Sequence, residues 1–244
     1  MNDSIKDRLI VALDVETGRE ARELFARLRD HAGMFKIGSQ LFTAAGPGIV
    51  RELVAAGARI FLDLKFHDIP NTVAAAGVEA ARLGVAIFNV HALGGSEMMR
   101  RTFGTVAEVS EREGLRRPLL IAVTVLTSAD SAALAEVGLP ADTVALVSRL
   151  ARLTEECGLD GVVASPNEIG LVRACVRKRD FLIVTPGVRQ AGAAADDQKR
   201  IMTPVEAVSA GADYLVVGRA VLKAPDPQRA LISILEEMAQ AISA

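Results

Sequence analysis

The most constraining feature of this chain is a regular alternation of short apolar runs with longer amphipathic or alanine-rich stretches. The runs are almost continuously apolar and rich in β-branched residues, which is typical of strands buried on both faces of a parallel sheet. We predict strands over residues 8–14, 34–38, 59–65, 85–91, 118–126, 159–165, 180–187 and 212–218.

The stretches between these runs predict helices, for example over 18–30, 142–158 and 227–242. A glycine often precedes the next strand, where the end of a helix needs a residue that tolerates positive φ. These glycines are Gly57, Gly84, Gly114, Gly158 and Gly211. Strands and helices in this number and order fit an α/β fold of the (β/α)8 TIM barrel type better than an open doubly wound sheet. We therefore predict one barrel domain over residues 1–244.

Composition excludes several classes of protein. The formal net charge is −2, tryptophan is absent and there is one tyrosine, so neither a basic face nor aromatic platforms for bases are expected. We therefore expect no nucleic-acid partner. The sequence also has no apolar run of membrane-spanning length, and its first residues lack the apolar segment of a signal peptide. We expect a cytoplasmic protein without a membrane partner.

Charged residues gather at the carboxyl ends of the predicted strands, which is where barrels of this type carry their active sites. Asp14 ends the first run, Lys36 lies in the second, and Asp63 and Lys65 end the third, with Asp68 just beyond. Strand ends can be polar simply because solvent begins there, but Lys36 and Asp63 are flanked by apolar residues. Asp63 and Lys65 are two positions apart and should point to the same side. The pattern predicts an array of paired charges in which Lys65, beside carboxylates, is a candidate proton donor.

A second group of polar residues follows the seventh and eighth strands. The loops after these two strands are the usual phosphate-binding site of this fold. The loop 189–204 is long and polar and could act as a flap. Gly218 would let the backbone approach a phosphate closely, and Arg219 could bind one with two hydrogen bonds. The alternative is that Arg219 pairs with a surface carboxylate. The phosphate candidates are Arg189, Gln198, Gly218 and Arg219.

The segment "FLDLKFHDIPNT" (61–72) resembles the signature of the orotidine 5′-phosphate decarboxylase family in its bacterial form. Further similar blocks occur in the family's order and cover nearly the whole chain: "LIVALD", "FKIGSQLFTAAGP", "NVHALGG", "LIAVTVLTS", "GLDGVVAS", "TPGVR", "DDQKRIMTP" and "GADYLVVGRAV". The resemblance implies a TIM barrel that works as a homodimer. It also implies conversion of orotidine 5′-phosphate to UMP in pyrimidine synthesis, without a metal or an organic cofactor.

The resemblance also implies roles for the charged residues. Lys65 would protonate C6 of the pyrimidine as the carboxylate leaves. Asp63 would lie beside the scissile carboxylate and pair with Lys36, and Asp14 and Lys36 would contact the ribose hydroxyls.

The same resemblance implies a site shared between two subunits and further residues that bind the substrate. Asp68, a catalytic candidate, would reach the partner's site together with Ile69 and Thr72. Thr127 would lie near the pyrimidine, and Pro186 would line the pocket. Arg189, Gln198, Gly218 and Arg219 would hold the phosphate.

Two alternatives remain open. Related barrels such as keto-gulonate-phosphate decarboxylase or hexulose-phosphate synthase share the Asp-x-Lys-x-x-Asp arrangement but use Mg²⁺. They would need another acidic ligand at the end of the first or second strand, and the second strand offers Lys36 instead. A non-catalytic barrel that binds UMP-like ligands would not need so much buried charge. We expect His67 and His91 to have structural rather than proton-transfer roles.

Overall fold

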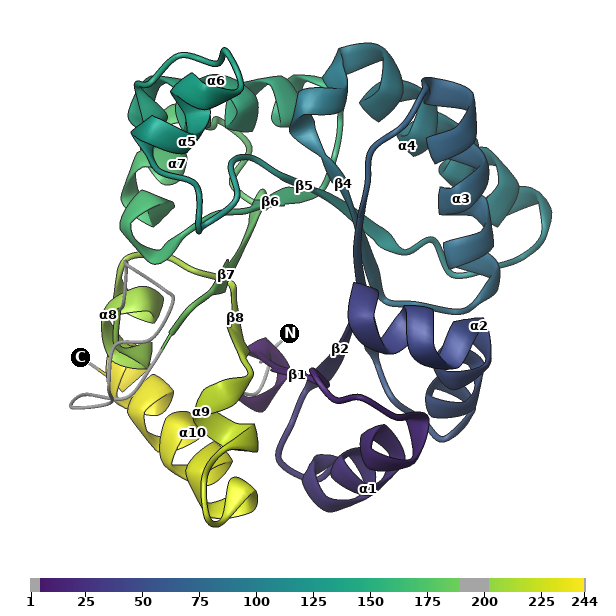
Figure 1. Cartoon of the computed structure of the whole chain (residues 1–244), viewed down its shortest axis with the longest axis vertical. Helices are drawn as coiled ribbons and strands as arrows, with labels where there is room; N and C mark the ends of the chain where they lie inside the picture. Colours follow the sequence, from purple (N-terminus) through teal and green to yellow (C-terminus); the bar gives the residue numbers. More distant parts are fainter. Residues whose placement is uncertain (1–4, 189–201, 244) are drawn as a thin grey trace.

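The strands form a closed parallel barrel surrounded by a ring of helices (Figure 1). The computed structural model describes residues 5–188 and 202–243. Each strand pairs with the next, and β8 pairs with β1, so the sheet has no edge. The predicted TIM barrel is therefore confirmed. Its strands are β1 Leu9–Ala12, β2 Met34–Gly38, β3 Ile60–Phe66, β4 Ile87–His91, β5 Leu119–Val123, β6 Gly161–Val163, β7 Leu182–Pro186 and β8 Tyr214–Val217.

Helices follow the strands and cover the outside of the barrel. The α-helices are α1 Gly18–Leu28, α2 Ser39–Ala55, α3 Pro70–Arg82, α4 Gly95–Arg112, α5 Ser131–Glu136, α6 Thr143–Glu156, α7 Ile169–Cys175, α8 Pro204–Ser209, α9 Arg219–Leu222 and α10 Pro227–Ser243. Three short 3₁₀ helices are η1 Ile5–Arg8, η2 Ala92–Gly94 and η3 Pro166–Glu168. The three helices predicted from the sequence correspond to α1, α6 and α10.

Helix α1 shows how local sequence sets an element. Thr17 and Glu20 form a capping box that satisfies free backbone N–H groups at its start. Ala21, Phe25 and Leu28 follow at helical spacing and are buried against the barrel. The cap and the apolar face thus point to the same structure, which is why the prediction holds here.

Six of the eight predicted strands are longer than the observed ones, and two of these differences bear on the site. β1 ends at Ala12, so Asp14 lies just beyond it. β5 ends at Val123, whereas we predicted a strand to residue 126. The Thr124 hydroxyl and N–H both donate to the Val163 carbonyl, after which the chain leaves the sheet. Thr127 is therefore a loop residue and not a strand end.

The apolar interior of the barrel forms the floor of its carboxyl end. Its buried residues come from β1, β2, β3, β4, β5, β7 and β8: Ile10, Ala12, Met34, Phe61, Ile87, Ile121, Val184 and Val216. A larger core lies between the strands and the helices. Because side chains two positions apart share a face, the next inward residues above this floor include Asp14, Lys36, Asp63 and Asn89. The alternation of the strands thus stacks a polar layer on an apolar one.

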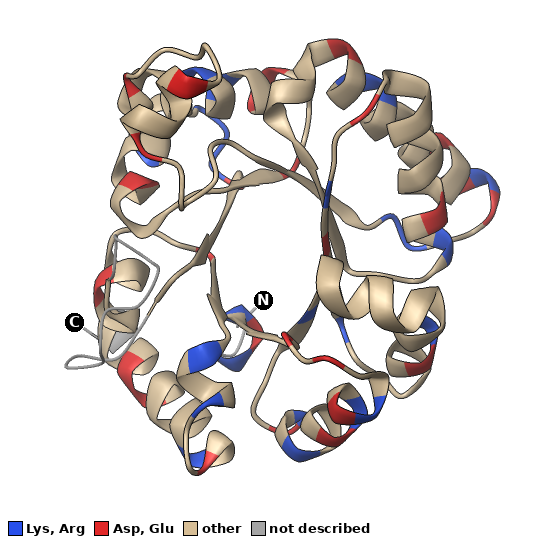
Figure 2. Cartoon of the chain, viewed as in Figure 1, with Lys and Arg blue, Asp and Glu red and all other residues tan. Residues whose placement is uncertain are grey.

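Charges of both signs are interspersed over the outer helices (Figure 2). None of the described helices is long and apolar enough to cross a membrane.

The glycines predicted at helix ends have the backbone conformation that we expected. All five have positive φ, for example 66° at Gly114 and 105° at Gly211. An L-residue at such a position is strained by contact of its Cβ with the following carbonyl.

Helix α4 offers a matched test of this conclusion. Gly104 lies inside the helix and Gly114 follows its end, and a Cβ added at either would meet nothing within 4 Å. We expect Gly114→Ala to lower the free energy of unfolding by about 1–2 kcal/mol. Gly104→Ala should raise it by about 0.5–1 kcal/mol, because it reduces the entropy of the unfolded chain. Urea denaturation measures both, and effects of the same sign would contradict the backbone argument.

Candidate active site

Four charged side chains converge above the apolar floor of the barrel, as predicted. Lys36 Nζ lies 3.0 Å from Asp14 Oδ1 and 3.4 Å from Asp63 Oδ2. Lys65 Nζ lies 2.7 Å from Asp63 Oδ1. The result is a continuous chain of alternating charges, Asp14–Lys36–Asp63–Lys65, contributed by β2, β3 and the residues after β1.

The two inner members of this chain are the most buried. The side chains of Lys36 and Asp63 are 12% and 14% exposed, whereas Lys65 is 37% and Asp14 53% exposed. Buried charges are tolerated when each has a partner of opposite sign and good geometry. Asp63 has an ammonium group on each oxygen, so removing either lysine would leave a buried negative charge only partly compensated.

The backbone around Lys65 departs from a regular strand. Lys65 has φ of 52°, and it is the one non-glycine residue with positive φ in the described part of the chain. The β3–β4 register shifts between Leu62 and Phe66. Such irregularities re-aim side chains and are frequent beside active sites. The sequence pattern did not indicate this bulge.

Asn89, on β4, contacts both charged residues of β3. Its Oδ1 accepts from the Lys65 backbone N–H at 2.8 Å, and its Nδ2 donates to Asp63 Oδ1 at 2.7 Å. Asn89 is fully buried. From the sequence it was one of several polar residues near a strand end, and only its inward position two residues after Ile87 could have singled it out.

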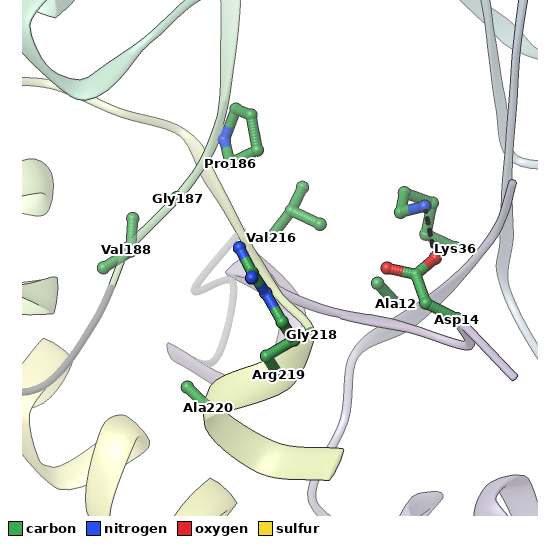
Figure 3. A pocket seen from close by; sticks show the side chains of 10 residues that line it. All are labelled: Ala12, Asp14, Lys36, Pro186, Gly187, Val188, Val216, Gly218, Arg219 and Ala220. Atoms are coloured by element: carbon green, nitrogen blue, oxygen red, sulfur yellow. Dashed lines mark hydrogen bonds and ion pairs between the residues drawn. The ribbon is translucent and has the colours of Figure 1, made fainter. Parts of the chain in front are cut away.

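Two adjoining cavities open beside the charged chain. The first, about 190 Å³, is lined by Ala12, Asp14, Lys36, Pro186, Gly187, Val188, Val216, Gly218, Arg219 and Ala220 (Figure 3). The second, about 220 Å³, is lined by Lys36, Phe61, Asp63, Lys65, Val123, Val125, Leu126, Thr127, Val163, Val184, Pro186 and Val216. Because Lys36, Pro186 and Val216 line both, the cavities form one continuous site with a polar end and a more apolar end.

The polar end contains two of the predicted phosphate-binding residues, Gly218 and Arg219. Arg219 extends into the first cavity, and the Lys36–Asp14 pair lies across from it (Figure 3). A Cβ on Gly218 would lie 3.4 Å from Asp14 Oδ2 and 3.5 Å from Ala12 Cβ, so the Gly218 backbone lies directly beside the Asp14 carboxylate. Arg189 and Gln198, the other phosphate candidates, and most of the loop 189–204 lie outside the described residues.

The second cavity holds the remaining pocket candidates. Thr127 lines it from the loop after β5, and Pro186 lines it from the end of β7. Its walls are otherwise mainly valines, together with the charged side chains of Lys36, Asp63 and Lys65. A flat apolar ring with one polar edge would match such a lining.

The three residues expected to serve a partner subunit do not join the cluster. Asp68, Ile69 and Thr72 are exposed. The Asp68 carboxylate accepts from the backbone N–H of Ile69, and the Ile69 side chain is 66% exposed at the start of α3.

The two histidines near the site form a stacked pair. Their ring centroids are 5.4 Å apart, and Nδ1 of His91 accepts from the backbone N–H of Leu93. Burial, with the nearby His67 and Lys65 charges, lowers the pKa of His91. His91 is thus a neutral hydrogen-bond acceptor near pH 7, which suits the structural role that we expected.

In the part of the chain that the structure describes, no three His, Cys, Asp or Glu side chains gather closely enough to hold a metal ion. At the end of β2, where a magnesium-dependent relative was expected to need an acidic ligand, Lys36 pairs with both Asp14 and Asp63.

Known proteins similar to this chain share both its sequence and its fold. It is 52% identical over 237 residues to an orotidine 5′-phosphate decarboxylase from Geotalea daltonii, covering 97% of this chain and 98% of that protein. It is 54% identical over 238 residues to the protein of the same name from Syntrophotalea carbinolica, covering 97% of each. The crystal structure of orotidine 5′-phosphate decarboxylase from Lactobacillus acidophilus matches with a TM-score of 0.82 and 36% identity, covering 94% of this chain and 98% of that one.

The sequence profile of the orotidine 5′-phosphate decarboxylase / HUMPS family matches residues 7–234. This range contains every strand of the barrel and all four members of the charged chain. Fold, site and sequence agree, and the chain belongs to the orotidine 5′-phosphate decarboxylase / HUMPS family.

Proposed function

We propose that this protein decarboxylates orotidine 5′-phosphate to UMP, with Lys65 as the proton donor and without a metal or organic cofactor. The observation that carries the proposal is the position of the Lys65 ammonium group. It is held 2.7 Å from Asp63 Oδ1 at the edge of a cavity that continues to Arg219.

The two-part cavity matches the parts of this nucleotide. The phosphate would bind at the Arg219 and Gly218 end, where Arg189 and Gln198 are expected to contribute. The ribose hydroxyls would lie against Asp14 and Lys36, between the two cavities. The pyrimidine would then enter the more apolar cavity near Thr127 and Pro186, with its C6 side toward Asp63 and Lys65.

The reaction needs positive charge at one carbon. When the bond from C6 to the carboxylate breaks, CO2 leaves and the electron pair stays on C6 in the plane of the ring, where the π system cannot delocalise it. An ammonium group fixed beside C6 stabilises this charge, and transfer of a proton from Lys65 Nζ to C6 completes UMP. Lys65 then regains a proton from solvent.

The contacts of Lys65 favour this step before substrate arrives. Asp63 and Asn89 hold its side chain and backbone, so little reorganisation is needed during the reaction. Electrostatic stabilisation of this kind is effective where water is largely excluded, as at the partly buried Asp63.

Substitution of Lys65 tests whether this protein is an enzyme or only binds nucleotides. We expect Lys65→Ala to lower kcat by more than about 1,000-fold, because in the part of the chain that the structure describes Lys65 supplies the one ammonium group that lies against Asp63 Oδ1. Affinity for UMP, measured by calorimetry, should remain within about tenfold.

Conversion of orotidine 5′-phosphate is followed by ultraviolet absorbance. Lys178→Ala, at an exposed lysine, is the matched control and should keep full activity. A wild-type protein that binds UMP but does not turn over would refute the decarboxylase and favour a binding protein.

Chelation separates the proposed reaction from that of magnesium-dependent relatives. Since Lys36 pairs with both Asp14 and Asp63, these two carboxylates already share a cation and are not free to hold a divalent ion. We expect the turnover of orotidine 5′-phosphate to be unchanged after dialysis against EDTA. Loss of activity that returns with Mg²⁺ would contradict the cofactor-free mechanism.

We further infer that the protein works as a homodimer in which Asp68, Ile69 and Thr72 complete the partner's site. Ile69 and Leu93 are large apolar residues that are 66% and 40% exposed. They follow the adjacent strands β3 and β4 at the carboxyl end of the barrel, where His67, just after β3, stacks on His91, the last residue of β4. Exposed apolar groups beside a charged site favour contact with another protein surface.

Mixing two inactive variants tests this shared site. In a hybrid of Lys65→Ala and Asp68→Ala chains, one site would carry both defects and the other neither. Equal mixing should restore about one quarter of wild-type activity, because half of the dimers are hybrids with one intact site. Full subunit exchange, followed by native mass spectrometry, without recovered activity would mean that Asp68 serves its own subunit.

We also propose that the protein acts in the cytoplasm. Cys157 and Cys175 are both free thiols, as is usual in a reducing compartment.

A further inference from the structure

We propose that Asn89 is a positioning residue for the decarboxylation, because it holds the bulged backbone that aims Lys65 and orients the Asp63 carboxylate. The inference deepens the proposed function and rests on it. It concerns a residue that would not touch the substrate, since Asn89 is fully buried and lines neither part of the cavity.

The register of β3 and β4 places Asn89 opposite the bulge. Leu62 pairs with Phe88, and Phe66 pairs with Val90. Three residues of β3, Asp63 to Lys65, therefore face a single residue of β4, which is Asn89. In a regular parallel ladder, the backbone of one residue of β4 cannot form hydrogen bonds with three residues of β3. Some backbone groups of β3 must therefore form hydrogen bonds elsewhere.

The Asn89 side chain supplies one of these partners. The Lys65 N–H donates to Asn89 Oδ1 at 2.8 Å, in place of a bond to the backbone of β4. Lys65 has φ of 52°, a conformation that is strained for a non-glycine residue and persists only when its surroundings enforce it. The bond from Asn89 favours this conformation over an extended one.

The other end of the same amide fixes Asp63. Nδ2 donates to Asp63 Oδ1 at 2.7 Å, the oxygen that also accepts from Lys65 Nζ at 2.7 Å. Asn89 is thus linked to Lys65 at both ends, directly through the backbone and indirectly through Asp63. This leaves Asp63 Oδ2 to face Lys36.

The chemistry of the amide is needed for both contacts. One atom must accept a hydrogen bond and the other must donate one to a carboxylate. Leucine has the volume but neither function. An ionised aspartate could accept from Lys65 N–H, but its second oxygen would repel Asp63. A protonated aspartic acid could make both bonds.

This difference gives the inference a test with a pH signature. We expect Asn89→Leu to lower kcat about 100-fold at every pH, with KM and the Kd of UMP changed less than about threefold. Asn89→Asp should be similarly impaired at pH 8. Its kcat relative to wild type should rise by at least about tenfold toward pH 5.5, as the introduced carboxyl group becomes protonated beside Asp63.

Thr154→Ala is the matched control for loss of a buried hydrogen bond. Thr154 is fully buried and donates to the Leu150 carbonyl in α6, away from the site. The Thr154→Ala variant should be less stable than the wild type but should keep the wild-type kcat. If Asn89→Leu does not fold, the pH profile of Asn89→Asp alone tests whether Asn89 positions Lys65 and Asp63.

The possible failures are distinguishable. Wild-type kcat in Asn89→Leu, or a parallel pH profile of Asn89→Asp and wild type, would overturn the role of Asn89 and leave the decarboxylase intact. A wild-type chain without turnover would instead refute the proposed function itself.

Discussion

The carboxylate of Asp63 is the contact on which the site depends. Lys36 lies against one oxygen, and Lys65 and Asn89 lie against the other. A carboxylate that is 14% exposed above an apolar floor would be costly without these partners. Their arrangement means that the position of Lys65 is set by the same interactions that make the buried charge tolerable.

The closed barrel is what brings these groups together. The residues above the floor come from different strands, and each follows an apolar residue by two positions, as Lys36 follows Met34 and Asp63 follows Phe61. Closure between β1 and β8 also brings Asp14 beside Gly218, where a Cβ would lie 3.4 Å from the carboxylate. An open sheet would separate these two loops, so the cavity between them is a consequence of closure.

Sequence reasoning predicted the features that follow from periodicity. Apolar runs gave the strands, and the spacing of Asp63 and Lys65 correctly placed both at one edge of the site. It overextended β5, because Val125 and Leu126 continue the apolar pattern although the backbone has already left the sheet. It also gave no sign of the bulge or of the Asn89 contacts. These depend on the register between β3 and β4, which no pattern within either strand specifies.

The bulge also explains why a lysine occupies a conformation that glycine adopts elsewhere in the chain. At Gly57 and Gly114 the backbone turns out of a helix and no side chain is needed, so glycine removes the strain. At residue 65 glycine would remove the strain together with the ammonium group. The conformation must then be enforced from outside, by bonds to the backbone N–H and to the charged end of the side chain. A strained backbone that neighbouring residues hold in place is expected where function, and not stability, determines which residue occupies the position.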